Sequence, residues 1–516
     1  MGDTVAAFDL GTGGVKAAIF RPDGTCIAEE VVSYRTFYPS PSCHEQRPED
    51  WWEAICASLR TLFENTAVKA GDIRAIAVSG HSLGCLPLDE NGALLQEFVP
   101  IWSDGRAVAE AEDFFTRVDP DTWYRTTGNG FPAPLYTVFK AMWLRRNAPD
   151  IFARTRTIIG TKDYINLRLT GRIATDPSYA SGTGVYDLKA GRYSAELVEA
   201  AGLSRELFPP IVASTDVLGD VLPEIAERLG LFPGVKVVAG GVDNSCMALG
   251  GRTFLEGDAY ASMGSSSWIT VSASEPLLDD RVRPFVFAHV APGMFISATS
   301  IFSSGTSFNW VTDTLLPDVK HAAKVAGMDV HDALFRLAGE APAGARGLIF
   351  VPTLGGGTSF EGGPAAVRGG FVGLDLQHGR ADILRATLEG VALGLRIALD
   401  ELRRMTAIGP EMIIVGGGAR SAFWRQVFAD VFDCAIVKTR VDQQAAALGA
   451  AALAFVGMGL WEDFLPIRTL HVAEGRTEPA PEARKVYRAA LAAYRRAAEQ
   501  QHELSGALAA LREAAT

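Results

Sequence analysis

The chain has 516 residues, which is too long for a single hydrophobic core and suits two domains of about 250 residues each. Hydrophobic residues make up 48% of the chain and charged residues 21%, a composition that excludes a largely disordered protein. The net charge of −12, without a basic run, argues against a nucleic-acid partner.

The cysteines and the N-terminus bear on the cellular compartment. The six cysteines are scattered and form neither a Cys-x-x-Cys pair nor a cluster with histidine, so they indicate no metal site and no disulfide framework. The chain starts directly with an apolar strand, and no uncharged apolar run reaches about 18 residues. We expect a cytoplasmic protein with no membrane partner.

A glycine-rich turn joins two apolar runs at the start of the chain. The first run covers residues 5–10, the turn reads Gly-Thr-Gly-Gly at residues 11–14, and the second run begins at Val15. Glycine supplies the backbone conformations that tight turns need, so the pattern predicts a β-hairpin. The same glycines leave backbone N–H groups open to an anion, because no side chain blocks the approach.

One acid and one base flank this turn. Asp9 precedes it and can hold a metal ion, while Lys16 follows it and can balance phosphate charge. Hairpin, acid and base together indicate a site for nucleotide phosphates. An ordinary tight hairpin is the alternative that the glycines alone leave open.

A second hairpin of related design lies about half the chain further on. Residues 258–273 contain two apolar-rich runs around Met-Gly-Ser-Ser-Ser at residues 263–267. Serine hydroxyls and backbone N–H groups after a strand are another common means of binding phosphate. The two hairpins predict a duplicated architecture with one nucleotide clamped between the halves.

The segment after the first hairpin contains the first candidate sugar contacts. A proline-rich loop at residues 39–50 leads into a helix that begins near Pro48. A strand at residues 73–78 then ends in Ser-Gly-His-Ser-Leu-Gly at residues 79–84, and ligands of open α/β proteins bind just beyond strand C-termini. His81 can donate to a substrate hydroxyl, or it can tie down its own loop.

Trp102, Asp104 and Arg106 share the next short loop. A carboxylate beside an aromatic ring is suited to a sugar, since the carboxylate accepts hydroxyl protons while the ring covers C–H groups. A local ion pair between Asp104 and Arg106 is the alternative interpretation.

The best candidate for a general base follows a buried strand. We expect structural helices at residues 137–147 and 162–169, and a strand at residues 231–239 that ends in Gly-Gly-Val-Asp-Asn at residues 240–244. An acid on a glycine turn after such a strand, here Asp243, is well placed to accept a proton. An aspartate that merely caps the turn is the alternative.

The second half of the chain again has strands followed by glycine-rich segments. A strand at residues 348–352 precedes a glycine-rich loop at residues 355–373, which is either a flexible linker or a mobile lid. A long helix at residues 382–404 follows. A strand at residues 412–415 then runs into Gly-Gly-Gly-Ala-Arg and a helix from Ser421, a combination that favours an anion or nucleotide.

Taken in this order, these segments resemble the FGGY carbohydrate kinases, most closely the xylulokinase branch, over roughly residues 5–460. The most specific segment is GGFVGLDLQHGRADILRATLE at residues 369–389, which fits the family's second sequence pattern throughout. TVFKAMWL at residues 137–144 fits the earlier pattern less tightly. HEQRPEDWW, WSDGR, KDYINLRLTG and GGGARSAFWRQVFAD also look like xylulokinase segments.

The resemblance implies an α/β fold of the duplicated actin/hexokinase-like (ribonuclease H-like) type, with a central cleft. The domains would cover residues 1–250 on the sugar side and residues 251–480 on the nucleotide side. The Ala/Arg/Glu-rich composition of residues 481–516 by itself predicts a C-terminal helical cap. The cofactors would be ATP and Mg²⁺, and the substrate a small sugar that receives the γ-phosphate on a terminal hydroxyl. The oligomeric state, including a homodimer, is left open.

The resemblance also assigns roles to individual residues. Asp9 would serve the magnesium ion, and Asp243 would be the catalytic base. The remaining nucleotide contacts would be Gly11, Thr12, Lys16, Gly264, Ser265, Ser266, Gly305, Gly417, Gly418 and Ala419. The sugar contacts would be His81, Ser82, Asp104, Asp243 and Asn244.

Two departures from the xylulokinase pattern concern the substrate. Xylulokinases carry Gln-Met-His-Gly where this chain reads His81-Ser82-Leu83-Gly84, and Glu-Arg-Thr-Pro where it has a glycine-rich loop. D-Xylulose, converted to D-xylulose 5-phosphate, is the leading expectation, and another ketose, a polyol or a sugar acid is the alternative. An actin-like ATP-gated binding protein without sugar transfer is the alternative of another class, against which Asp243 argues.

Overall fold

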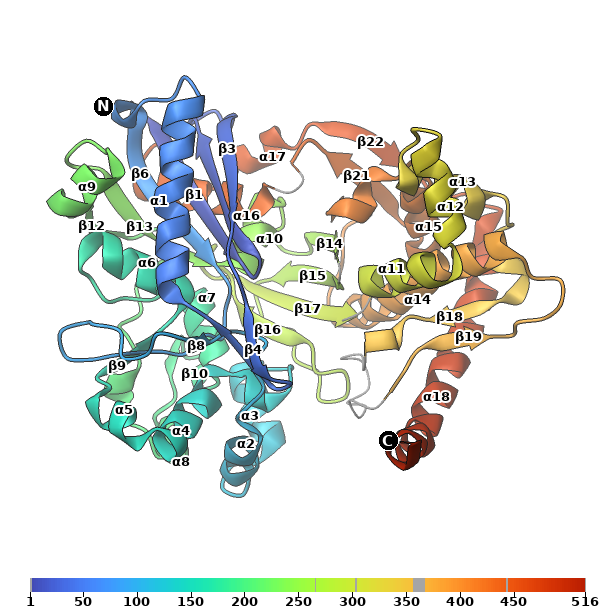
Figure 1. Ribbon diagram of the computed structural model, residues 1–516, viewed down its shortest axis with the longest axis horizontal. Coiled ribbons are helices and arrows are strands. Elements are labelled where there is room, and N and C mark those ends of the chain that lie inside the picture. The colour runs from blue at the N-terminus through green and yellow to red at the C-terminus, as the bar shows by residue number, and fades with distance from the viewer. Residues whose placement is uncertain (1, 265, 302–303, 356–366, 442–443, 516) are drawn as a thin grey trace.

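The computed structural model describes residues 2–264, 266–301, 304–355, 367–441 and 444–515. Two lobes, each built around a mixed β-sheet, lie side by side (Figure 1). In the described part of the chain, no helix is both long enough and apolar enough to cross a membrane.

The first sheet has the strand order β12-β13-β6-β1-β2-β3. β1 pairs antiparallel with β2 and parallel with β6, and β6 pairs parallel with β13. The bounds are β1 Thr4–Gly11, β2 Gly14–Phe20, β3 Cys26–Ser33, β6 Ile73–Gly80, β12 Val217–Asp220 and β13 Lys236–Val242. β1 and β6 are almost fully buried, which explains why their sequences are nearly continuous apolar runs.

The second sheet has the strand order β16-β17-β15-β14-β20-β21-β22. The bounds are β14 Ala259–Met263, β15 Ser267–Ala273, β16 Phe285–Ala288, β17 Phe295–Ile301, β20 Glu411–Val415, β21 Ala435–Thr439 and β22 Ala473–Thr477. β14 again pairs antiparallel with the next strand of the chain and parallel with β20, which pairs parallel with β21. The order β17-β15-β14-β20-β21 therefore repeats β3-β2-β1-β6-β13, including strand directions.

Helices cover both faces of the first sheet. α1 (Pro48–Asn65), α6 (Thr161–Thr170) and α9 (Pro223–Leu229) contribute to the apolar cluster on one face. The other face holds α10 (Asp243–Gly250) and α16 (Ala445–Gly457), which contact each other along their length. α16 is apolar on all sides and buried, although its residues come from the second half of the chain.

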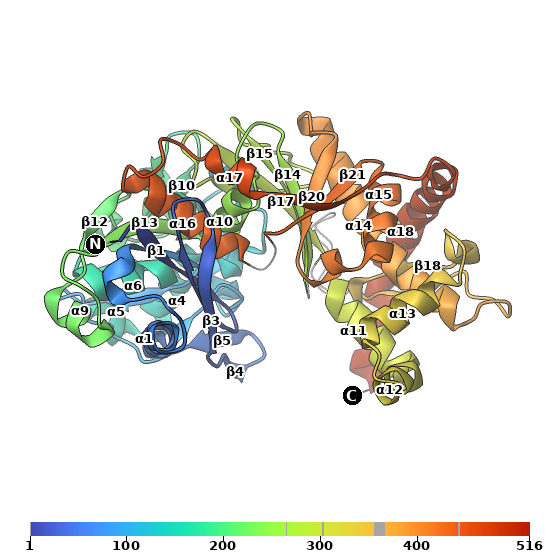
Figure 2. The same ribbon diagram turned by 90° about the horizontal axis from the view of Figure 1, so that it is seen from above.

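The second sheet carries its helices mainly on the side away from the first lobe. Seen from above, β14, β15 and β17 lie toward the boundary between the lobes, and the helices α14, α15 and α18 lie beyond them (Figure 2). The helices of this lobe are α11 Ser304–Leu315, α12 Pro317–Val325, α13 Val330–Gly339, α14 Arg380–Met405, α15 Ala422–Phe432 and α18 Ala483–Ala515. α17 (Pro466–Leu470) instead lies with α16 on the first lobe, where Ile467 joins the apolar cluster of α10 and α16.

An additional subdomain extends the first lobe. It contains α2 Val108–Phe115, α3 Pro120–Thr127, α4 Thr137–Asn147, α5 Pro149–Arg154, α7 Pro177–Ala180 and α8 Ala195–Ala200. Small two- and three-stranded sheets complete the chain: β4 Phe37–Ser40 with β5 Cys43–Gln46 and β8 Val99–Pro100, β7 Leu86–Leu88 with β9 Thr157–Ile159, β10 Tyr186–Asp187 with β11 Arg192–Tyr193, and β18 Ile349–Val351 with β19 Gly370–Val372. The subdomain packs against the second sheet in one apolar cluster that includes Tyr136 and Phe285.

The duplicated α/β architecture expected from the sequence is confirmed, and both predicted hairpins are present as β1–β2 and β14–β15. The division at residues 250 and 480 stays a prediction. Of the predicted glycine-rich loop at residues 355–373, residues 356–366 lie outside the described chain.

Candidate active site

Asp9 lies near the C-terminal end of β1, directly beside β6. Its register partner there is Ser79, whose Oγ donates to Asp9 Oδ1 at 3.1 Å. Burial raises the pKa of the Asp9 carboxyl group, and the opposite charge of Lys16 partly offsets this effect. Lys16 is the register partner of Asp9 on β2, so the hairpin places this acid and base on neighbouring strands.

The turn of the first hairpin consists of Thr12 and Gly13, between the paired residues Gly11 and Gly14. A Cβ atom on Gly14 would lie 2.6 Å from the Val32 carbonyl oxygen, so this position requires glycine for the close approach of β3. Thr12 is exposed, and its Oγ1 accepts from Trp102 Nε1 at 2.9 Å. The loop that contains Asp104 therefore contacts the hairpin directly.

A bulge in β13 determines where Asp243 lies. The pairing of β13 with β6 shifts register between Val238 and Gly241, and Gly240 has a φ of +71°. A Cβ atom there would lie 2.0 Å from the Val78 carbonyl oxygen, which only glycine avoids. The strand continues to Val242, and Asp243 is the first residue of α10.

Asp243 has the electrostatic properties of a general base. Burial, and next the negative charge of Asp9, raise its pKa to about 7, although its Oδ1 accepts from the Asn244 N–H at 2.7 Å. A base whose pKa lies near the working pH combines a useful ionised fraction with a strong tendency to take up a proton. The predicted metal ligand and the predicted base are thus brought within electrostatic reach of each other.

His81 is packed into the first lobe. Its ring is buried, with Nε2 3.3 Å from Gln46 Oε1 and Nδ1 3.1 Å from Thr161 Oγ1, and burial lowers its pKa to about 4. Its backbone N–H donates to the Leu10 carbonyl. Because both ring nitrogens have protein partners, the geometry favours the alternative in which His81 ties down its loop. Ser82, the next residue, is half-buried.

Asp104 is fully buried and uses both oxygens within the protein. Arg106 donates to both through Nε (2.8 Å to Oδ1) and Nη2 (2.7 Å to Oδ2), and the His44 N–H donates to Oδ2 at 2.7 Å. Arg106 also pairs with Glu45 and stacks on Trp143. The ion pair that the sequence left open as an alternative is present, and a sugar contact of Asp104 stays a prediction.

The predicted nucleotide residues of the second half meet around Met263 at the end of β14. Cβ atoms on Gly416 and Gly418 would lie 2.5 Å from the Met263 carbonyl oxygen and 3.1 Å from Met263 Cβ, so the short turn that holds Gly417, Gly418 and Ala419 lies against this hairpin. Gly305 is the second residue of α11, whose first residue, Ser304, is hydrogen-bonded to Ser267. Gly264 is exposed and Ser266 half-buried, and Ser265 lies outside the described residues.

Asp9 fits the requirements of a magnesium ion that arrives with a nucleotide. Among the described residues, no group of three or more His, Cys, Asp or Glu side chains could hold a metal ion on its own. Magnesium in phosphate-transfer sites uses one or two carboxylates and completes its shell with substrate phosphates and water. Asp9 would hold such an ion, since Oδ2 accepts no hydrogen bond from the described chain, and the ion would neutralise phosphate charge.

Three residues of the site region were not singled out from the sequence. Tyr34 Oη donates to the Gly11 carbonyl, Gln46 Nε2 donates to the Thr12 carbonyl, and the buried Lys140 Nζ donates to the Leu83 and Ile101 carbonyls at 2.8 and 2.6 Å. Burial lowers the pKa of Lys140 to about 7. A lone lysine amid the apolar residues of helix 137–147 was a usable signal. Gln46 stands in the segment HEQRPEDWW, but its hydrogen-bond partner, like that of Tyr34, is distant in sequence, so the sequence showed neither contact.

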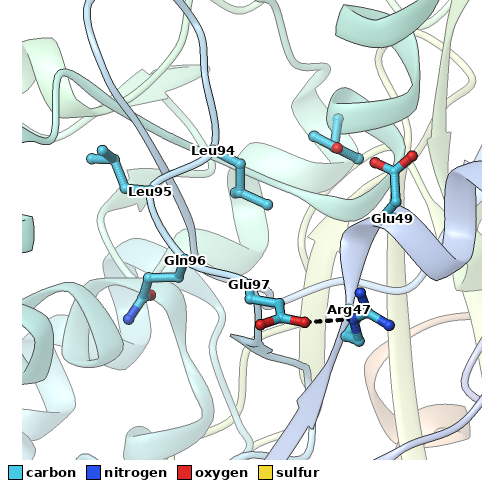
Figure 3. Close-up of a pocket in the computed structure, with 7 residues that line it drawn as sticks. Arg47, Glu49, Leu94, Leu95, Gln96 and Glu97 are labelled. Atoms are coloured by element: carbon cyan, nitrogen blue, oxygen red, sulfur yellow. Dashed lines mark ion pairs between the residues drawn. The ribbon is translucent and has the colours of Figure 1, made fainter.

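A surface pocket of about 360 Å³ lies outside this site (Figure 3). Its lining residues are Arg47, Glu49, Leu94, Leu95, Gln96, Glu97 and Tyr164. Arg47 Nε pairs with Glu97 Oε1 at 3.1 Å, and Glu49 pairs with Arg168 at 2.7 Å. The pocket contains none of the predicted site residues, so we assign it no part in the chemistry.

Comparisons with known proteins agree with the resemblance seen in the sequence. The N-terminal and C-terminal domain profiles of the FGGY family of carbohydrate kinases match residues 4–250 and 259–458. A xylulose kinase of Bacillus subtilis is 30% identical over 462 residues, 89% of each chain. A gluconokinase of Bacillus licheniformis is 28% identical over 483 residues, 93% of this chain and 92% of its own.

A solved structure extends the likeness to three dimensions. The xylulose kinase from Rhodospirillum rubrum superposes with a TM-score of 0.88 at 28% identity, covering 98% of this chain and all of the other. With both domain profiles matched in order, the chain belongs to the FGGY family of carbohydrate kinases, phosphotransferases that act on an alcohol group of a sugar with ATP as the phosphate donor.

Proposed function

We propose that this protein transfers the γ-phosphate of ATP to a terminal hydroxyl of a small sugar, with D-xylulose as the substrate and D-xylulose 5-phosphate as the product. The observation that carries the proposal is Asp243. It is a half-buried carboxylate with a pKa of about 7, within electrostatic reach of the first hairpin's Asp9. A sugar hydroxyl is a poor nucleophile, and a positioned base contributes on the order of 10²- to 10⁴-fold to its reaction.

The other residues of the site divide the remaining work. In our proposal, Asp9 takes the magnesium ion of MgATP, and Gly11, Thr12 and Lys16 face the transferring phosphate. Fixed donors and a cation near the transferred group supply most of the catalysis in phosphoryl transfer. The second-half contacts are assigned to the remainder of the nucleotide: Gly264, Ser265 and Ser266 to phosphate, and Gly305, Gly417, Gly418 and Ala419 to the adenosine side.

D-Xylulose is favoured because the xylulose kinase relatives match nearly the whole chain. A sugar acid is the second candidate, since a gluconokinase is 28% identical over a similar length. The loop at residues 81–84 is a reason to keep both D-xylulose and a sugar acid as candidates. Where xylulokinases carry the histidine of Gln-Met-His-Gly, this chain has Leu83, which lies in the core. Another ketose or a polyol remains a further alternative.

The proposal is tested by measuring ADP release with MgATP and a panel containing D-xylulose, other ketoses, glycerol and gluconate. We expect ADP release to rise with D-xylulose well above the rate without sugar, and removal of magnesium by a chelator to abolish the increase. The Asp243→Asn variant should lose phosphorylation while still binding ATP, and Asp150→Asn, an exposed acid on α5, should behave as wild type. A higher kcat/KM for gluconate would replace the proposed substrate, and retained turnover by Asp243→Asn would remove it as the base.

A further inference from the structure

The turn of the first hairpin is held by its carbonyl groups. Tyr34 Oη donates to the Gly11 carbonyl at 2.5 Å, and Gln46 Nε2 donates to the Thr12 carbonyl at 2.7 Å. The backbone N–H of Tyr34 donates to the Gly13 carbonyl at 3.3 Å. Three consecutive carbonyls of an exposed turn are therefore bound by the segment that follows the hairpin.

The geometry of the peptide group transfers this restraint to the N–H groups. In a planar trans peptide the C=O and the N–H point in opposite directions. The Gly11 carbonyl shares a peptide plane with the Thr12 N–H, and the Thr12 carbonyl shares one with the Gly13 N–H. Holding these carbonyls on the side of Tyr34 and Gln46 therefore turns both N–H groups to the other side.

Those two N–H groups have no acceptor within the described part of the chain. Thr12 and Gly13 are exposed, and a Cβ atom on Gly13 would meet no atom within 4 Å. Adjacent backbone N–H groups that point to the same open side form a ready anion site. The turn thus has a bound carbonyl side and an open N–H side.

The side-chain amide of Gln46 is held in one of its two possible flip orientations. The side chain is fully buried, and its Oε1 accepts from Trp51 Nε1 at 2.9 Å. Because the indole N–H only donates, Oε1 must face Trp51, and Nε2 must face the Thr12 carbonyl and Thr36 Oγ1. The core helix α1 thereby fixes the amide that holds the turn.

Tyr34 lies against the turn of the hairpin, within electrostatic reach of Asp9 and Asp243. Burial, and after it the charges of Asp9 and Asp243, raise the pKa of its phenol well above the ordinary value. The phenol therefore stays protonated and acts as a donor at physiological pH. Its partner, the Gly11 carbonyl, lies two residues beyond Asp9 on the same strand.

We propose that Tyr34 and Gln46 are positioning residues that bind the carbonyl side of the first hairpin, so that the N–H groups of Thr12 and Gly13 face the γ-phosphate. The inference rests on the proposed function, because it takes the hairpin as the site of the transferring phosphate. Neither residue touches the nucleotide in this arrangement.

The test compares Tyr34→Phe, which removes only the hydroxyl, with Tyr38→Phe, the same change on an exposed tyrosine of β4. Gln46→Glu is the second variant, because a carboxylate keeps the bond from Trp51 but cannot donate to the Thr12 carbonyl. Binding of ADP and of a non-hydrolysable ATP analogue is measured by calorimetry, and kcat and the sugar KM by ADP release. Thermal unfolding shows which variants are folded.

We expect Tyr34→Phe and Gln46→Glu to weaken analogue binding about 3- to 10-fold, the range of one hydrogen bond, with ADP binding within twofold of wild type. The kcat should fall by at least the same factor, the sugar KM should stay constant, and Tyr38→Phe should match wild type. Equal losses for ADP and the analogue, or a Tyr34→Phe variant that matches Tyr38→Phe, would overturn the inference.

The two hypotheses fail in different ways. Wild-type protein without sugar-dependent ADP release contradicts the proposed function, and the ratio of analogue to ADP affinity still decides the role of the hairpin. Active wild-type protein with unaffected variants contradicts only the positioning role. If Gln46→Glu does not fold, Tyr34→Phe decides alone, because loss of one hydroxyl leaves the aromatic packing in place.

Discussion

Asp9, which is buried, and Asp243, which is half-buried, are two carboxylates that influence each other. Burial raises the pKa of both, and the charge of Asp9 adds to the shift of Asp243. Each carboxylate is therefore costly to ionise in the folded protein, and this cost makes Asp243 a better proton acceptor than an exposed aspartate. The same electrostatics govern how activity and stability respond to pH.

The first prediction concerns the rate. Since Asp243 must be ionised to accept a proton, and its pKa is about 7, kcat/KM for the sugar should fall as the pH is lowered from 7 to 5. The limiting slope is tenfold per pH unit for one essential base. The measurement is a pH–rate profile at saturating MgATP, and a flat profile across this range would exclude Asp243 as the titrating base.

The second prediction concerns stability at the same residue. A raised folded-state pKa means that between about pH 4 and 7 the folded protein holds a proton that the unfolded chain has lost, so Asp243 lowers stability as the pH rises. The Asp243→Asn variant removes this cost. Its thermal midpoint should exceed that of wild type at pH 8, by an amount corresponding to roughly 1.4 kcal/mol per unit of pKa shift, and the gap should close toward pH 4.

The control for this comparison is Asp150→Asn, which removes an exposed carboxylate. Its thermal midpoint should follow that of wild type at every pH. If Asp243→Asn melts below wild type at pH 8, burial is not what raises the pKa of Asp243.

For single residues, the sequence was informative where a candidate could be recognised from its immediate neighbours along the chain. Asp9, Lys16 and Asp243 each stand beside a glycine turn after an apolar run, and that pattern marks them without any knowledge of the fold. Tyr34 and Gln46 bond to residues 23 and 34 positions away, so only the packed structure shows their role. His81 falls between these two groups. The sequence predicted the loop in which it lies, but not the two residues that contact its ring nitrogens.

Among the elements, the crossing of α10 and α16 links the two halves most closely. A Cβ atom on Gly449 of α16 would lie 1.9 Å from the Cys246 carbonyl oxygen of α10, and one on Gly250 would lie 1.8 Å from the Ala445 carbonyl oxygen. Two glycines thus let the helix backbones touch. Because α10 begins at Asp243, this contact also supports the helix that presents the proposed base.

The third prediction tests this crossing. Gly449→Ala should push the helices apart and destabilise the protein by about 1–3 kcal/mol, the usual cost of overpacking, with a fall in kcat because α10 moves. Gly506→Ala is the matched control: Gly506 also lies in a helix, and its Cβ atom would meet nothing within 4 Å. The control should leave the thermal midpoint unchanged or slightly higher. Equal midpoints for both variants would contradict the close packing.

Element boundaries were predictable to within a few residues where apolar periodicity was clear. The helix expected at residues 137–147 is α4, and the helix expected at residues 382–404 is α14. β13 differs, because we expected the strand to end at residue 239. It runs to Val242, since Gly240 forms a bulge and pairing with β6 resumes at Gly241. A bulge depends on the neighbouring strand, which one segment of sequence does not show.

For the whole molecule, the repeated strand order was foreseeable from two similar hairpins half a chain apart. The packing of α16 on the first sheet was not, because its apolar sequence fits any buried environment. The connection between α10 and β14, from Gly250 to residue 258, is also held by distant residues. His471 Nε2 lies 2.8 Å from the Gly250 carbonyl oxygen, and His289 Nε2 lies 2.8 Å from the Thr253 carbonyl oxygen.

These two histidines are neutral in the folded protein at physiological pH. Each donates from Nε2 to a carbonyl, His289 Nδ1 accepts from the Ala291 N–H, and His471 Nδ1 lies 2.9 Å from Thr439 Oγ1. Burial lowers the pKa of both to about 4, and Arg252 and Arg468 lower that of His471 further. Between about pH 6.5 and 4 the unfolded chain therefore binds two protons that the folded protein excludes, and stability falls as the pH falls.

The fourth prediction follows from this proton balance. In the double variant His289→Gln and His471→Gln, the glutamine amides keep a donor for each carbonyl but cannot titrate. Its thermal midpoint should therefore decline less steeply than that of wild type between pH 6.5 and 4.5, even if it starts lower. The slopes of the free energy of unfolding against pH should differ between the two proteins by up to about 2.7 kcal/mol per pH unit, twice the limit for one titrating group. The exposed His321→Gln control should keep the wild-type slope. If the double variant also kept the wild-type slope, the titration of these two histidines would not explain the loss of stability at low pH.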